Sequence, residues 1–439
     1  MGLVLSNGTV AQLSPSVVRR ADVLVEGDAI TEIQDEIAPG DHEVFDADGA
    51  LIMPGNVCGH THLYSVLARG MPPPSKTPHN FPEILEYIWW RLDRALDEPA
   101  IRSSGAIGAI DALKSGTTTL IDHHASPGCI SGSLDMLAEE MSRAGVRGVL
   151  CYEVTDRNGR DGRKEGLREN ERFARGISDR FPTMRAMFGA HASFTLDDES
   201  LDAVAGTAHD LGLGVHIHVA EDVFDQTDSL ERSGQRVAHR LDDHGIVGAR
   251  SLLAHGVHLA DGEIDLIGNR RSWVSHNCRS NLNNSVGRAP VPLLLQRCAG
   301  RAVLGTDGID QDMFAESRSA YFRAREDSLD AFAEQYIDML AAGADLASQC
   351  FGRPIGRIEP GYLADLQIYD YTPPTPLTAN NLAWHWMFAF TNNLVKHVMV
   401  GGRWVVRDRS MVNVDGGAAR AIARERATAL WQRMESVPL

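Results

Sequence analysis

The chain has 439 residues, enough for two or three ordinary domains or for one large barrel with an appendage. Of these residues 43% are hydrophobic and 23% charged, close to the average for soluble globular proteins. Its formal net charge of −17 argues against binding to nucleic acid or to an anionic membrane, since either needs a basic patch. The six cysteines are scattered and form no Cys-x-x-Cys pair, which fits a reducing compartment better than a disulfide framework. We see neither a signal peptide nor an apolar run of about 18 residues that would suggest a membrane span. We therefore expect a cytoplasmic location.

The first 53 residues contain short β-rich segments separated by turns. Residues 23–25 and 29–33 are such segments, and they flank the tripeptide Glu26-Gly27-Asp28. A glycine-containing turn between two short apolar runs is typical of a β-hairpin. The N-terminal part of the chain is therefore predicted to be a small β-structure.

From residue 51 onward, short apolar runs alternate with amphipathic or polar stretches of helical length. The runs cover residues 51–57, 117–121, 146–151, 185–189, 214–219, 251–254, 272–275 and 302–305. Eight such units in roughly 300 residues are what a (β/α)8 TIM-type barrel requires. We therefore predict an α/β fold with this barrel as its main part.

After about residue 360 the β-rich pattern returns. Residues 364–369 form one run, and residues 395–406 hold a Gly401-Gly402 turn between two others. Because the ends of a barrel lie near each other and each flank is short for its own core, we expect the two flanks to form one β-sandwich. The predicted domains are 1–53 and 360–439 for the sandwich and 54–359 for the barrel; two unrelated terminal modules are the alternative.

Polar residues with catalytic chemistry gather where the apolar runs end. They are His60, His62, His191, His218, Glu221, His255 and Asp307. The carboxyl ends of the strands form the face on which barrel enzymes build their active sites. We therefore expect these side chains to converge on one site.

The pair His60-Thr61-His62 has i, i+2 spacing, which places both rings on the same side of a strand. His218 and Asp307 follow runs five and eight, and strand eight of a closed barrel lies beside strand one. Three imidazoles and one carboxylate suit a divalent ion such as Zn²⁺ and leave a position for water. These four residues are therefore the predicted metal ligands.

A second metal ion is not expected. Barrel hydrolases with two metals use a carbamylated lysine after strand four as a bridge, and the chain has His191 at that place. Its lysines lie only at positions 76, 114, 164 and 396.

Glu221 and His255 are the predicted groups for proton transfer and polarisation. Glu221 follows the ligand His218 by three residues, and a carboxylate there can carry a proton from metal-activated water to a leaving group. His255 ends run six, where it can polarise the attacked group. A solvated surface carboxylate for Glu221 and a structural imidazole for His255 are the alternatives.

Several of these motifs resemble the amidohydrolase superfamily. They are Met53-Pro54-Gly55, His60-Thr61-His62, His218-Val219-Ala220-Glu221, Leu253-Ala254-His255 and Leu304-Gly305-Thr306-Asp307-Gly308. The resemblance is to the mononuclear branch, with its cytosine, adenosine-type and guanine deaminases and its triazine hydrolases. It implies Zn²⁺ or Fe²⁺ on the four predicted ligands, Glu221 as proton shuttle, His255 beside the metal-bound water, and a homo-oligomer.

Several longer sequence segments resemble the SsnA group of aminohydrolases. The name of this group does not imply a substrate. They include Trp89-Trp90-Arg91-Leu92-Asp93-Arg94-Ala95-Leu96, Ile121-Asp122-His123-His124-Ala125-Ser126-Pro127 and Thr155-Asp156-Arg157-Asn158. The resemblance extends over essentially the whole chain.

The predicted function is that of a deaminase-type aminohydrolase acting on a small nitrogen heterocycle or ureide, with a purine-related compound as one option. Metal-bound hydroxide would attack, Asp307 would accept the water proton, Glu221 would protonate the ring nitrogen and His255 would stabilise the intermediate. The alternatives are hydrolysis of a cyclic amide, a ureide or a chlorinated heterocycle at the same site. A catalytically inactive binding or assembly protein is an alternative of another class.

Five residues are predicted to contact the substrate: His123, His124, Trp89, His191 and Asn277. Each follows a strand of the predicted barrel or lies in the long segment from Arg69 to Leu96. That segment is predicted to be either a lid over the pocket or a contact with a second subunit.

Overall fold

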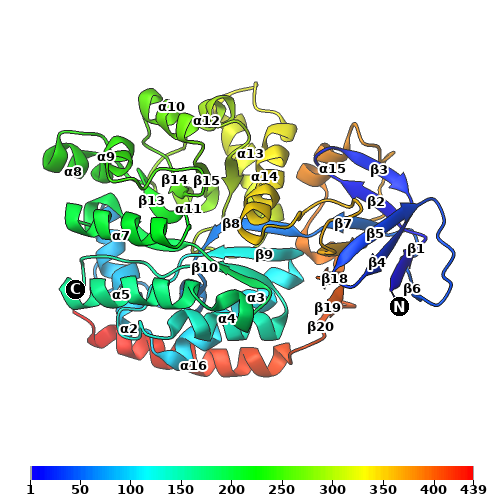
Figure 1. Cartoon of the computed structure of the whole chain (residues 1–439), viewed down its shortest axis with the longest axis horizontal. Coiled ribbons are helices and arrows are strands. Elements are labelled where there is room, and N and C mark those ends of the chain that lie inside the picture. Colours follow the sequence, from blue (N-terminus) through cyan, green and yellow to red (C-terminus); the bar gives the residue numbers. More distant parts are fainter. Residues whose placement is uncertain (1, 439) are drawn as a thin grey trace.

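A ring of parallel strands forms the centre of the larger part of the computed structural model, which describes residues 2–438 (Figure 1). The strands are β8 (Asn56–Thr61), β9 (Thr117–Asp122), β10 (Arg147–Leu150), β11 (Met184–Ala186), β12 (Phe188–Ala192), β13 (Val215–Val219), β14 (Leu252–His255), β15 (Trp273–His276) and β16 (Ala302–Leu304). β11 and β12 together make the fourth strand, interrupted at Met187. The predicted (β/α)8 barrel is thus confirmed.

Two seams join the half-sheets β11-β10-β9-β8 and β12-β13-β14-β15-β16. At one seam the N–H groups of Thr306 and Asp307 donate to the carbonyl oxygen of His60, at 2.8 and 3.0 Å. At the other, the N–H of His191 donates to the carbonyl oxygen of Val154 at 2.9 Å. The first seam brings the residues that follow β16 directly beside β8.

Helices surround the barrel and connect successive strands (Figure 1). The longer ones are α3 (Glu98–Lys114), α4 (Ser133–Ala144), α5 (Gly159–Ala174), α7 (Asp198–Asp210), α8 (Val223–Ser233), α10 (Asp261–Arg270), α13 (Met313–Asp327) and α14 (Ala333–Phe351). Shorter ones are η1 (Leu63–Ala68), α1 (Phe81–Ile84), the π-helical turn η2 (Leu85–Trp89), α2 (Trp90–Ala95), α6 (Ile177–Arg180), η3 (Ser193–Thr195), α9 (Val237–Asp243), α11 (Cys278–Asn283) and α12 (Val291–Arg297). Asp97, Asp197 and Asp222 cap α3, α7 and α8 by accepting backbone N–H groups.

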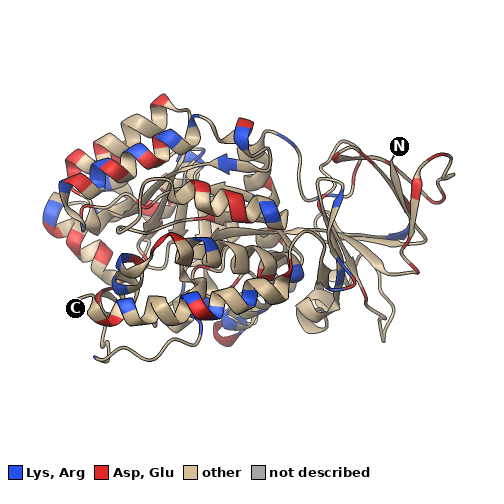
Figure 2. Ribbon diagram, turned by 90° about the horizontal axis from the view of Figure 1, so that it is seen from below, with Lys and Arg blue, Asp and Glu red and all other residues tan. Residues whose placement is uncertain are grey.

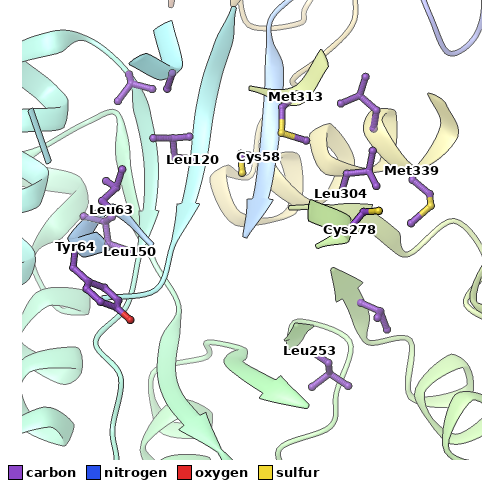
Figure 3. Close-up of a cluster of buried hydrophobic side chains, with 14 of the residues drawn as sticks. Cys58, Leu63, Tyr64, Leu120, Leu150, Leu253, Cys278, Leu304, Met313 and Met339 are labelled. Atoms are coloured by element: carbon purple, nitrogen blue, oxygen red, sulfur yellow. The ribbon is translucent and has the colours of Figure 1, made fainter. Parts of the chain in front are cut away.

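Buried apolar side chains from the strands and from the helices around them form the core of the barrel. Leu120 from β9, Leu253 from β14 and Met313 from α13 belong to this core (Figure 3). Acidic and basic residues are interspersed along the outer helices (Figure 2). Among residues 2–438, no helix is both long and apolar enough to cross a membrane.

The first predicted run, residues 51–57, is not one strand. β7 (Leu51–Pro54) belongs to a different sheet, and the barrel strand β8 begins at Asn56. Gly55 lies between them, where a Cβ atom would come within 2.3 Å of the Thr118 side chain. As a result His60 lies within β8 rather than after it.

Two sheets built from both flanks form the smaller part of the molecule (Figure 1). One sheet has the order β5-β4-β1-β6, and the other has the order β20-β19-β18-β17-β7-β2-β3. Their strands are β1 (Leu3–Ser6), β2 (Thr9–Gln12), β3 (Val17–Arg20), β4 (Asp22–Glu26), β5 (Ala29–Gln34), β6 (Glu43–Asp46), β17 (Leu366–Tyr369), β18 (Val395–Val400), β19 (Arg403–Arg407) and β20 (Ser410–Met411). This confirms the predicted β-sandwich and the hairpin of β4 and β5.

The last helix, α16 (Gly416–Ser436), lies along the barrel rather than against the sandwich (Figure 1). Trp431 Nε1 donates to the carbonyl oxygen of Leu67, and Arg433 Nε donates to that of Ala95, both at 2.9 Å. α15 (Leu382–Phe388) and the short turn η4 (Asn392–Leu394) precede β18. The exact domain boundaries at residues 53 and 360 stay a prediction.

Candidate metal centre and active site

Four side chains meet at the carboxyl end of the barrel: His60, His62, His218 and Asp307. His60 lies in β8, His62 directly follows it, His218 lies in β13 and Asp307 follows β16. One possible ligand atom from each lies within 4.8 Å of all the others. The structure therefore brings together all four side chains that the sequence singled out as metal ligands.

Backbone carbonyls fix the tautomers of two of these histidines. His62 Nδ1 donates to the carbonyl oxygen of His123 at 2.6 Å, and His218 Nδ1 donates to that of His191 at 2.8 Å. In each neutral ring, Nε2 then carries a lone pair. The two Nε2 atoms face each other at 3.1 Å. Two converging lone pairs repel unless a cation or a proton lies between them.

His60 is oriented by His216, which lies two residues before His218 on β13. His60 Nδ1 and His216 Nε2 are hydrogen-bonded at 2.8 Å. His60 Nε2 is fully buried and has no hydrogen-bond partner among the described residues. A buried nitrogen without a partner, aimed at two bare imidazole nitrogens and a carboxylate, fits a metal ligand.

Asp307 is held in place by its neighbours. Its Oδ1 lies 2.9 Å from His62 Nε2, and the hydroxyl of Ser280, in α11, donates to its Oδ2. The backbone of Asp307 has a φ of +54°, a conformation that L-residues rarely adopt. Two residues earlier, a Cβ atom on Gly305 would come within 2.8 Å of His60 Cβ. The strand end is therefore strained and tightly packed around the site.

Glu221 and His255 lie beside this cluster. His255 Nδ1 donates to Asn281 Oδ1 at 2.9 Å, which turns Nε2 towards Glu221 Oε2 at 3.5 Å and Asp307 Oδ2 at 3.9 Å. Asn284 Nδ2 donates to Glu221 Oε1 at 3.2 Å. A carboxylate and an imidazole thus face the same region as Asp307, as proton transfer requires.

Burial shifts His60, His218 and Glu221 towards their neutral forms, whereas at His62 the adjacent Asp307 outweighs burial and raises the pKa to about 9. It lowers the pKa of His60 to about 4 and that of His218 well below its usual value, so both rings are neutral, the form that binds metal. Burial also raises the pKa of Glu221. Burial alone would raise the pKa of Asp307 too, but the adjacent His62 and His60 outweigh it and hold that pKa well below its usual range.

The donor set fits a single divalent ion. Three imidazole nitrogens and one carboxylate oxygen are ligands that zinc accepts in catalytic sites. Two further groups of side chains could hold a metal, His123 with Glu153 and His218, and Glu221 with His255 and Asp307. Each shares a residue with the first group, so the described part of the chain presents one connected centre.

A cavity opens onto this centre and encloses about 610 Å³, counting its open mouth. Among the predicted substrate contacts, His191 and Trp89 line it, together with Glu221. Thr195 Oγ1 accepts from His191 Nδ1 at 2.8 Å, because the Thr195 hydroxyl itself donates to the carbonyl oxygen of Ala192.

The structure does not bring the other three predicted contacts to the cavity. His123 and His124 are fully buried: His123 Nε2 donates to the carbonyl oxygen of Ala190 at 3.0 Å, and His124 Nε2 is hydrogen-bonded to Ser126 Oγ at 2.9 Å. Asn277 is also fully buried and accepts from Ser275 Oγ at 2.8 Å. None of the three is among the described residues that line the cavity, and their contact with the substrate stays a prediction.

The segment from Arg69 to Leu96 forms one wall of the cavity. Phe81, Leu85, Trp89 and Trp90 all line it. An apolar wall of this kind fits the lid prediction.

Sequence reasoning missed several side chains of the site. Ser280 and Asn284 lie on and just after α11, and Asp93 and Glu153 line the cavity from α2 and from the segment after β10. Asp93 lies in the segment Trp89 to Leu96 that resembles the SsnA group, but no spacing rule links Asp93 or Ser280 to the proposed ligands.

The chain matches the model described as "Amidohydrolase family" over residues 51–405. It is 30% identical over 419 residues to a 5'-deoxyadenosine deaminase of Methanopyrus kandleri, covering 93% of this chain and 94% of the relative. It is 31% identical over 444 residues to a 5-methylthioadenosine/S-adenosylhomocysteine deaminase of Haloarcula marismortui, covering 98% and 99%.

A solved structure of similar fold is that of an adenosine deaminase from Xanthomonas campestris with bound zinc. It has a TM-score of 0.85 and 25% sequence identity, and the match covers 99% of both chains. The likeness thus includes the barrel and the sandwich together.

Proposed function

The chain belongs to the amidohydrolase family, and on that premise we propose that it is a zinc-dependent aminohydrolase that removes the exocyclic amino group of an adenine nucleoside or a closely related purine. It is a hydrolase of carbon–nitrogen bonds other than peptide bonds, and its substrate is a small molecule. The observation that carries the proposal is the close approach of the Nε2 atoms of His62 and His218, 3.1 Å apart, with Asp307 and Glu221 beside them.

In this proposal His60, His62, His218 and Asp307 hold one zinc ion; iron(II) accepts the same donors. When bound, the ion supplies Lewis-acid activation of a water molecule. The remaining chemistry belongs to the side chains around it. Replacement of the amino group by the oxygen of water releases ammonia.

Glu221 carries the proton that the purine ring needs. The hydrogen bond from Asn284 holds one carboxylate oxygen, so the other remains for the substrate. A burial-raised pKa makes Glu221 both an acceptor and a donor near neutral pH. Protonation of the ring nitrogen next to the attacked carbon makes that carbon more electrophilic.

Asp307 accepts a proton from the attacking water, and His255 stabilises the negative charge that develops on its oxygen. Asp307 Oδ2 accepts the proton that the water loses, and it lies 3.9 Å from His255 Nε2. His255, held by Asn281, stabilises the negative charge that develops on the attacking oxygen. The leaving amino group takes a proton and departs as ammonia.

The purine part of the proposal rests on the relatives, several of which are named for deamination of adenine nucleosides. His191 and Trp89 are proposed substrate contacts because both line the cavity. The cytoplasmic location and the homo-oligomer remain predictions.

An ammonia-release screen tests the substrate class. Zinc-loaded protein is incubated with 5'-deoxyadenosine, methylthioadenosine and S-adenosylhomocysteine, and with a cyclic ureide and a chlorinated triazine as representatives of the alternative reactions. Ammonia from an adenine nucleoside supports the proposal. Ring opening or chloride release, without ammonia from any purine, contradicts it.

A further inference from the structure

One wall of the cavity carries a buried cluster of charged side chains made of Asp93, Glu153 and Arg157. Arg157 Nη2 donates to Asp93 Oδ2 at 2.9 Å and to Glu153 Oε1 at 2.8 Å. The side chains are 2%, 4% and 11% exposed, respectively. Asp93 and Glu153 both line the cavity, and the guanidinium of Arg157 lies 4.6 Å over the Trp90 ring. We call these three residues the acidic cluster.

The acidic cluster contains two carboxylates and one guanidinium. Besides the proposed metal ligands, the other basic side chains nearby are Arg94, on the same helix as Asp93, and His123, whose Nδ1 lies 3.6 Å from Glu153 Oε2. His123 Nε2 donates to a backbone carbonyl, so in the neutral ring Nδ1 carries a lone pair and no proton. Asp93 Oδ1 is fully buried and has no hydrogen-bond partner among residues 2–438. The two carboxylates therefore share the one guanidinium that is hydrogen-bonded to them, and burial raises the pKa of both carboxyl groups.

The rest of the cavity supplies no positive side chain to balance the acidic cluster. The carboxylates that line the cavity are Asp93, Glu153, Glu221 and Asp307, and no lysine or arginine is among the described lining residues. A divalent ion held by the proposed ligands would balance Asp307 and Glu221. The charge of the acidic cluster remains, and leaving a buried charge unpaired is costly.

We infer that the substrate carries a cationic nitrogen group, such as an ammonium or amidinium, which pairs with Asp93 and Glu153 inside the cavity. The inference rests on the proposed function for the reaction and adds to it the charge of the substrate. Trp89, Trp90 and Tyr64 line the same cavity, and aromatic rings favour cations over anions. A phosphorylated nucleotide would meet only negative side chains there.

Benzamidine and benzamide form a matched pair of probes, because they have the same shape and only benzamidine is cationic at neutral pH. Their binding to zinc-loaded protein is measured by isothermal titration calorimetry. We expect the wild type to bind benzamidine at least about tenfold more tightly than benzamide. Equal affinity for the two probes overturns the inference, and this comparison needs no variant.

The variants Asp93→Asn and Glu153→Gln test whether these two carboxylates cause the preference for benzamidine. Each is expected to reduce the affinity for benzamidine about tenfold or more and to leave that for benzamide unchanged. The matched control is Glu171→Gln, which removes an exposed carboxylate paired with Arg175 and should not change either affinity. Zinc content and melting temperature confirm that each variant is folded. If both cavity variants keep the full preference for benzamidine, the inference is wrong.

Ammonia release from the three adenine nucleosides of the screen, of which S-adenosylhomocysteine carries an ammonium group, separates this inference from the proposed function. If benzamidine is preferred but no ammonia forms, the proposed adenine deamination fails and the cation site stands. If ammonia forms but benzamidine is not preferred, the cation site fails and the proposed deamination stands.

Discussion

The hydroxyl of Ser280 donates a hydrogen bond to Asp307 Oδ2, while Oδ1 of the same carboxylate faces His62 Nε2 at 2.9 Å. Ser280 lies on α11, which follows β15, and Asp307 follows β16. The contact therefore ties together two neighbouring strand ends of the barrel. Ser280 is a positioning residue for a proposed metal ligand.

Replacing Ser280 with alanine should weaken metal binding without removing it. Loss of a hydrogen bond that orients a ligand typically lowers metal affinity by about 10- to 100-fold. A competition titration with a zinc chelator measures the change. Ser348→Ala, which removes a hydroxyl bonded within α14, serves as the control. Unchanged zinc affinity in the Ser280→Ala protein would show that this contact does not position Asp307.

Glu221→Gln should bind zinc normally and lose most of its activity. The glutamine keeps an oxygen for Asn284 but cannot carry a proton, and loss of a general acid–base typically costs about 10²- to 10⁴-fold in rate. Metal analysis and the ammonia-release rate are measured on the same sample. Activity within a few-fold of the wild type would remove Glu221 from the mechanism.

Asp225 should make the stability of the protein depend on pH. It is buried, and its Oδ2 accepts from the N–H of Ala220 at 2.8 Å. Burial, with a smaller contribution from Asp228, raises its pKa to about 7. Because this is above the unfolded value of about 3.9, the contribution of Asp225 to stability is fully present below about pH 4 and is lost as the pH rises to about 7.

Asp225→Asn removes this titration. The free energy of unfolding of the wild type, minus that of the variant, should fall by roughly 1.4 kcal/mol per pH unit at most between about pH 4 and pH 7 and then level off. Urea unfolding of both zinc-loaded proteins at several pH values measures the difference, in which the titration of the histidines cancels. A difference that is constant, or that grows with pH, contradicts the assignment.

Arg147 and Asp365 join the barrel to the sandwich by a buried ion pair. Arg147 Nε lies 2.5 Å from Asp365 Oδ2, and the side chains are 6% and 0% exposed. Asp365→Ala leaves the guanidinium buried and unpaired, which should cost about 3–5 kcal/mol. The double variant Arg147→Met with Asp365→Leu should be less destabilised. Urea denaturation checks both, and a loss under about 1 kcal/mol in Asp365→Ala would show that the pair is unimportant.

Much of the fold could be predicted because each barrel strand is marked in the sequence by a short run rich in apolar residues. Val215–Val219, which forms β13, is one example. The first predicted run, residues 51–57, was wrong as a single strand, because Leu51–Pro54 and Asn56–Thr61 belong to different sheets. The boundary between β7 and β8 depends on which strands pair with each of them, and those strands lie far away in the sequence. Periodicity within a run carries no such information.

The four proposed metal ligands could be predicted to lie together because i, i+2 spacing and the ends of strands set their directions locally. Ser280 and Asn284 were not, because their contacts depend on how the segment after β15 packs against Asp307 and Glu221. His123 follows β9 as His62 follows β8, yet its ring lies among backbone carbonyls. Position at a strand end therefore predicts nearness to the site but not access to the cavity.

The most direct test of the account is a zinc titration of metal-free protein followed by the rate of ammonia release from its best purine substrate. We predict that the rate rises in proportion to added zinc and saturates at one ion per chain, as the single group of three histidines and one aspartate requires. Full activity without metal, or saturation only at two ions per chain, would contradict it.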